Sequence, residues 1–164
     1  MFEKYIIFLE RIFKEMGLKD TLSSFIAEGI SLLTLFASAI ILYLLAVFII
    51  KKTIYVFIEK SQSKRDDILI KNKVLQRICL LIPAYIIRYN IEFGLPSFPV
   101  LSSTIILFTK MYEVFIYSRV IDGLLTTLND IYNTYEISKS KPIKGFIQVL
   151  KTIVYIVCFL LIIA

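Results

Sequence analysis

GISLLTLFASAIILYLLAVFII, residues Gly29–Ile50, is a run of 22 residues without a charged side chain, and Lys51 and Lys52 follow it directly. A helix of about 20 apolar residues matches the hydrocarbon core of a bilayer, which is about 30 Å thick. A helix of a soluble protein rarely stays apolar on every face over such a length. The segment therefore predicts a membrane-spanning helix in an integral membrane protein.

The composition fits several short-looped membrane helices and leaves no room for a separate soluble domain. Hydrophobic residues make up 58% of the 164 residues, mean hydropathy is +0.79, and charged residues still account for 20%. The net charge of +6 comes from lysines and arginines beside apolar stretches. Membrane topology and lipid headgroups explain basic residues in such places, so nucleic acid is not expected as a partner.

Residues 1–22 predict an amphipathic helix, because apolar side chains recur at helical spacing and charges fill the other face. The segment is too charged to cross a bilayer, so it either lies along the membrane surface or packs on the rest of the protein. Gly17 is expected to end this helix. Ser23 or Ser24 is expected to cap the next one.

The sequence predicts an all-α fold, an integral membrane helical bundle of about four transmembrane helices plus the N-terminal amphipathic helix. Residues 23–164 are expected to form the membrane domain, with spans at about 28–52, 74–94, 99–118 and 143–164. Pro83 lies inside the second span, where neighbouring groups can satisfy the freed carbonyl. An apolar helical face continues past the third span to about residue 137. The chain ends on VCFLLIIA without a polar flank, which predicts an N-terminal piece of a longer protein.

The distribution of lysine and arginine predicts one orientation. Residues 51–77 hold eight Lys or Arg and three acidic residues, whereas the turn at 89–99 holds no Lys or Arg. The stretch 117–151 holds five more basic residues. By the positive-inside rule, the first and third connections are cytoplasmic, and the N-terminus lies outside.

No constellation of residues predicts an enzyme, a metal site or a bound cofactor. The sequence has no histidine, which removes the commonest general base and metal ligand. Asp66 and Asp67 are adjacent, so on a helix they point about 100° apart, and a capping role, with Ser63 as the cap, fits them better than acid–base chemistry. Cys79 and Cys158 lie in apolar surroundings and are expected to be small buried hydrophobes.

Three charges fall inside or near the apolar spans, where charges are costly and are usually paired or reach the interface. Lys110 and Glu113 are three residues apart and are expected to pair on one helical face. Arg88 is expected to reach the outer headgroups. An ion-conducting or proton-relay role for these charges stays open. The candidate contacts for lipid headgroups are Lys51, Lys52, Arg88, Lys139, Lys141 and Lys144. The alternative for the five lysines is that they only set the orientation of the chain.

Two stretches resemble one family of channels. SKRDDILIKNKVLQRICLLIPAYII, residues 63–87, resembles the segment after the first span in the YbdG-like, five-span branch of the small-conductance mechanosensitive (MscS) channel family. SKSKPIKGFIQVLKTIVYIV, residues 138–157, is similar to the entry into the helix before that family's pore helix. The residues that carry the likeness are Asp66, Asp67, Pro142, Ile143, Lys144, Gly145 and Gln148.

The resemblance implies a homoheptamer in the bacterial inner membrane that opens under bilayer tension and releases ions and small solutes during hypoosmotic shock. The Gly/Ala-rich pore helix and the cytoplasmic domain of that family are not found in these 164 residues. The expected role is therefore the tension-sensing, lipid-facing portion of such a channel. Phe115 and Ile106 are expected to face lipid, and replacing either with Asn is expected to raise the gating tension.

Two other readings stay open. A subunit of a small transporter or permease would use broken helices and polar groups at the midplane, and Pro83 with Arg88 agrees weakly with that. A membrane anchor for a cytoplasmic effector would need the spans alone. Membrane lipids and further copies of the chain are the partners expected.

Overall fold

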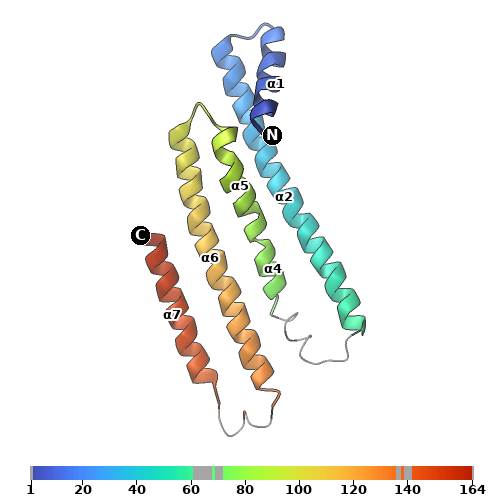
Figure 1. Ribbon diagram of the computed structural model, residues 1–164, viewed down its shortest axis with the longest axis vertical. Helices are drawn as coiled ribbons and strands as arrows, with labels where there is room; N and C mark the ends of the chain where they lie inside the picture. The colour runs from blue at the N-terminus through green and yellow to red at the C-terminus, as the bar shows by residue number, and fades with distance from the viewer. Residues whose placement is uncertain (1, 61–67, 69–71, 136–137, 139–141, 164) are drawn as a thin grey trace. The chain divides into compact units, whose positions relative to one another are not determined.

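The computed structural model describes residues 2–60, 68, 72–135, 138 and 142–163. All the elements with described bounds are α-helices (Figure 1). Within this part of the chain, four helical segments are long and apolar enough to cross a membrane. The predicted all-α helical bundle is therefore confirmed.

Helix α1 spans Phe2–Glu15, and Gly17 follows its end with a φ of +86°. The N–H of Leu18 donates to the carbonyl of Phe13 at 3.2 Å, and the N–H of Gly17 donates to that of Lys14 at 3.0 Å. These two bonds form a Schellman motif, in which glycine adopts the left-handed conformation at low steric cost. Gly17 thus ends the first helix as predicted.

Helix α2 spans Asp20–Lys60 and begins earlier than the sequence predicts. Ser23 and Ser24 do not cap it, because both lie inside the helix and donate their hydroxyl protons to the carbonyl of Asp20 at 2.8 and 2.9 Å. Asp20 occupies the first turn, where a carboxylate suits the positive end of the helix dipole. The prediction of a serine cap was therefore wrong.

The second candidate span consists of two helices, α4 over Val74–Cys79 and α5 over Leu81–Gly94. Pro83 explains the interruption at Leu80. Proline lacks an N–H to donate to the carbonyl four residues earlier, which is that of Cys79, and its ring crowds the same carbonyl. A short turn over Leu95–Phe98 then joins α5 to the next helix.

Helix α6 spans Pro99–Tyr132 and α7 spans Lys144–Ile163. Proline is well suited to the first position of α6, because the N–H it lacks would have no intrahelical partner there. At 1.5 Å per residue, the 34 residues of α6 extend about 51 Å, which exceeds the hydrocarbon thickness. One end of α6 is therefore expected to project into the interface or beyond it.

The four candidate spans are Asp20–Thr53, Val74–Gly94, Pro99–Tyr132 and Lys144–Ile163. The first and last are the most apolar, with mean hydropathies of 2.7 and 2.5 against 1.2 and 1.3 for the middle two. Only a minor share of each span is buried inside the structure, and the share is smallest in the last. Most of their apolar surface is thus exposed.

The chain divides into two compact units. The first unit contains Met1–Tyr43 and Ile82–Lys110, and the second contains Leu44–Leu81 and Met111–Ala164. In the first unit, α1 lies beside the beginning of α2, and α5 lies beside the beginning of α6 (Figure 1). In the second unit, α4 and α7 both lie along the later part of α6 (Figure 1).

The first unit is packed around Leu35 of α2, Ile91 of α5 and Leu95 of the following turn, all three of which are buried. Ile105 and Ile106 of α6 are partly buried and pack against this cluster. Gly94 lies close to α2, because a Cβ there would be 3.7 Å from the hydroxyl of Ser31. Apolar packing therefore joins α2, α5 and the start of α6.

Candidate functional site

Large apolar side chains are exposed on all four candidate spans. The exposed fraction is 65% for Phe48, 54% for Phe93, 66% for Phe108 and 63% for Phe159. So much exposed apolar surface is unusual for a soluble monomer and is expected where lipid or another protein covers it. Phe115 is exposed as predicted, whereas Ile106 is half-buried against the cluster of Leu35, Ile91 and Leu95, so its predicted lipid contact is at best partial.

The described basic residues that were predicted to contact lipid headgroups lie on three different helices. Lys51 and Lys52 are exposed on the later part of α2, and Lys144 is exposed at the start of α7. Arg88 is half-buried on α5, where it takes part in an interaction. Lys139 and Lys141 lie outside the described residues, as do Asp66, Asp67 and the proposed Ser63 cap.

Lys110 and Glu113 lie on α6 in different environments. Glu113 is 4% exposed and takes part in an interaction, whereas Lys110 is exposed. Their pairing stays a prediction.

The family-like motif forms the entry into α7. Pro142 and Ile143 precede the helix, and Lys144, Gly145 and Gln148 are exposed residues of its first two turns. An open groove of about 280 Å³ lies beside this entry. Its lining consists of five polar residues and one isoleucine, namely Thr126, Asn129, Lys144, Ile147, Gln148 and Lys151.

A cluster of three charged side chains in the second unit was not predicted. Lys151 Nζ of α7 lies 2.8 Å from Asp122 Oδ1 of α6. Arg77 Nη1 of α4 lies 3.6 Å from Asp122 Oδ2. Lys151 Nζ also donates to the hydroxyl of Thr126 at 2.6 Å. The three charged side chains are 17–26% exposed, so water screens them only partly.

Gly123 makes room for one arm of this cluster. Arg77 Nη1 donates to the backbone carbonyl of Arg119 at 2.6 Å, and a Cβ at position 123 would lie only 2.8 Å from the same nitrogen. Val74 of α4 would lie 3.2 Å from that Cβ. Glycine at this position therefore lets α4 and its arginine approach the backbone of α6.

A second link joins α4's entry to α6. The side-chain amide of Asn72 donates to the hydroxyl of Thr127 at 3.1 Å and to a carboxylate oxygen of Asp130 at 3.2 Å. Thr127 is buried, and its hydroxyl donates to the carbonyl of Gly123. The same face of α6 thus carries polar contacts over about two turns.

The first unit contains one buried carboxylate that sequence reasoning did not single out. Glu28 of α2 is 1% exposed, and its Oε1 accepts the backbone N–H of Ser97 at 3.2 Å. Its Oε2 has no hydrogen-bond partner among the described residues, and neither has the buried hydroxyl of Ser31 one turn further on. Glu28 therefore holds the turn before α6 against α2, and the ring of Phe25 meets that of Phe98 edge-on at 5.4 Å beside it.

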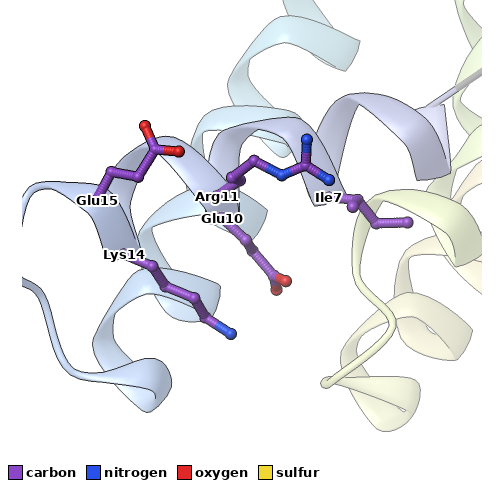
Figure 2. A pocket seen from close by; sticks show the side chains of 5 residues that line it. All are labelled: Ile7, Glu10, Arg11, Lys14 and Glu15. Carbon is purple, nitrogen blue, oxygen red and sulfur yellow. The ribbon is translucent and has the colours of Figure 1, made fainter.

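A depression of about 440 Å³ lies on α1 and is lined by Ile7, Glu10, Arg11, Lys14 and Glu15 (Figure 2). All five side chains come from one helix, and Figure 2 shows them fanning outward rather than converging. Lys14 forms an exposed ion pair with Asp20 at 3.2 Å. This surface is the polar face of an amphipathic helix, and its arrangement gives no binding site.

In the part of the chain that the structure describes, no group of three or more Cys, Asp or Glu residues is placed to hold a metal ion. Cys79 is buried and Cys158 is partly buried, and both are free thiols. The predicted burial is therefore confirmed for Cys79, whereas Cys158 is less buried than predicted.

Comparison of the chain with protein-family models, curated proteins and solved structures finds no match.

Proposed function

We propose that this chain is the tension-sensing, lipid-facing membrane portion of a mechanosensitive channel that releases ions and small solutes on hypoosmotic shock. The observation that carries the proposal is the exposure of large apolar side chains on every candidate span. Bilayer tension does work in proportion to the change in membrane area, so a sensor needs a large surface in contact with lipid. Helices with little mutual burial provide such a surface.

The resemblance of residues 63–87 and 138–157 to the five-span MscS-like branch supports the same function. It implies a homo-oligomer, a heptamer in that family, in the bacterial inner membrane. The excess of lysine and arginine in residues 51–77 favours an N-terminus outside the cytoplasm.

A transporter subunit is the second candidate, and the interruption of the second span at Leu80 favours it. Transporters build substrate sites from discontinuous helices whose ends meet near the midplane. The described part of the chain has one interrupted span, whereas the usual transporter architecture has a matching pair in two repeats. A membrane anchor for an effector is the third possibility, and recordings of tension-gated current separate it from a sensor.

Patch recordings of the full channel, in cells that lack other mechanosensitive channels, test the proposal. Phe115→Asn places an amide on a face that is 55% exposed, and it is expected to raise the gating tension because the amide weakens contact with acyl chains. Phe115→Leu keeps an apolar side chain and serves as the matched control. Absence of tension-gated current in the unaltered protein, or equal thresholds for Phe115→Asn, Phe108→Asn and the controls, would contradict it.

A further inference from the structure

The ionic cluster in the second unit connects three helices through one carboxylate. Asp122 of α6 receives Lys151 from α7 and Arg77 from α4, so two positive charges share one negative charge. Tyr155, one turn beyond Lys151, also reaches Asp122. Removing this carboxylate would leave two partly buried cations without their common counter-ion.

Helix α7 has few other contacts that fix its position. Ile147 is its single buried residue among those the structure describes, and its span is the least buried of the four. The groove beside Thr126 and Lys151 shows that packing between α6 and α7 is open there. Among the described residues, Lys151 links α7 to α6 through its bonds to Asp122 and Thr126.

In a membrane, apolar contacts between helices are easier to replace than ionic ones. Acyl chains are as apolar as leucine, so a contact between two apolar helix faces can be replaced by contacts with lipid at small cost. Asp122 lies just beyond the predicted end of the third span at about residue 118, and acyl chains offer no counter-ion for its two cations. The cluster is thus the contact that acyl chains replace least well.

We infer that Asp122, Arg77 and Lys151 form an ionic latch that holds α4 and α7 on α6, with Gly123 providing the space in which Arg77 is seated. The latch resists separation of these helices. Its role in setting the tension of opening rests on the function proposed above.

Distances between spin labels test the latch independently of any channel activity. Labels are placed at the exposed positions Leu128→Cys of α6 and Val149→Cys of α7, in the full-length protein with Cys79→Ala and Cys158→Ala. The protein is reconstituted in nanodiscs, and labelled subunits are diluted with unlabelled ones so that distances within one subunit dominate. Pulsed electron paramagnetic resonance then gives the distribution of distances between the labels on α6 and α7.

The unaltered cluster is expected to give a narrow distribution, and Asp122→Asn a broader one shifted to longer distances. Asp122→Glu keeps the charge and is expected to restore most of the narrow population. Lys151→Met removes the α7 arm alone and is expected to broaden the distribution even if Asp122→Asn fails to fold. Thr152→Val changes an exposed residue of the same helix outside the cluster, and is expected to leave the distribution unchanged.

A distribution that stays narrow in both Asp122→Asn and Lys151→Met overturns the latch. Equal broadening by Asp122→Glu and Asp122→Asn also overturns it, because packing rather than charge would then hold the helices. If the distances change as expected but patch recordings of the unaltered protein show no tension-gated current, the latch stands and the proposed channel function fails. If current is present, Asp122→Asn is expected to lower the gating tension, and an unchanged threshold overturns the regulatory role of the latch.

Discussion

In the first unit, α2 and α5 meet through the apolar side chains of Leu35, Ile91 and Leu95, whereas in the second unit α6 holds α4 and α7 through Asp122. The two units therefore depend on contacts that respond differently to a membrane. Shape complementarity determines whether apolar side chains prefer each other to lipid. Charge determines whether the ionic cluster stays closed. Substitutions in each unit can separate these two effects.

The largest effect is expected from Ile91→Ala, because Ile91 is fully buried in the first unit. We expect a loss of about 2 kcal/mol in the free energy of unfolding, near the lower end for such truncations, because lipid or detergent supplies part of the apolar environment in the unfolded state. Titration with SDS in mixed micelles measures this quantity. Leu45→Ala, at a position that is 50% exposed, is the control and is expected to change it by less than about 0.5 kcal/mol. Similar losses for the two variants would show that Ile91 is not a packing centre.

A smaller loss is expected from Gly123→Ala in the second unit. The added methyl group displaces the end of the flexible Arg77 side chain and presses on Val74, so we expect a loss of about 1 kcal/mol in the free energy of unfolding. The same SDS titration applies. If Gly123 acts by making room for Arg77, the double variant Gly123→Ala, Arg77→Met should lose little more unfolding free energy than Arg77→Met alone. The small remainder is the cost of the contact between the added methyl group and Val74. Fully additive losses of unfolding free energy would show that Gly123 has no part in accommodating Arg77.

The smallest effect is expected from Glu28→Gln. Glutamine keeps the carbonyl oxygen that accepts the Ser97 N–H and places an amide where Oε2 has no hydrogen-bond partner among the described residues, so we expect a change of less than about 0.5 kcal/mol. Glu28→Ala removes the acceptor and is expected to lose about 1 kcal/mol in the same titration. Equal losses in Glu28→Gln and Glu28→Ala would mean that the carboxylate charge, which both variants remove, matters more in the first unit than the bond to Ser97.

Individual helices were predictable where one local physical signal dominated. The uncharged run Gly29–Ile50 requires a spanning helix whatever its neighbours are, and Gly17 ends α1 through a preference of its own backbone. The start of α2 at Asp20 was missed because polar residues are common both in the first turn of a helix and in the loop before it. The interruption at Leu80 had a local signal in Pro83, but its position depends on which carbonyl the ring crowds.

The candidate site was less predictable than the fold. Lys144 and Gln148 were singled out by resemblance and do lie on a groove, yet Arg77, Asp122 and Lys151 were not recognised as a group. Their positions in sequence are far apart, and only helix packing brings them together. Gly123 carries no signal by itself, since its role depends on where Arg77 arrives.

The central claim is that the apolar helices cross a bilayer four times from an external N-terminus. Single cysteines at Lys19, Ser97 and Asn133, which lie at described helix ends and turns, test it in a background with Cys79→Ala and Cys158→Ala. In intact cells, a membrane-impermeant maleimide is expected to label positions 19 and 97, and to label position 133 only after permeabilisation. Labelling of position 133 from outside, or of 97 and 133 from the same side, would contradict the account.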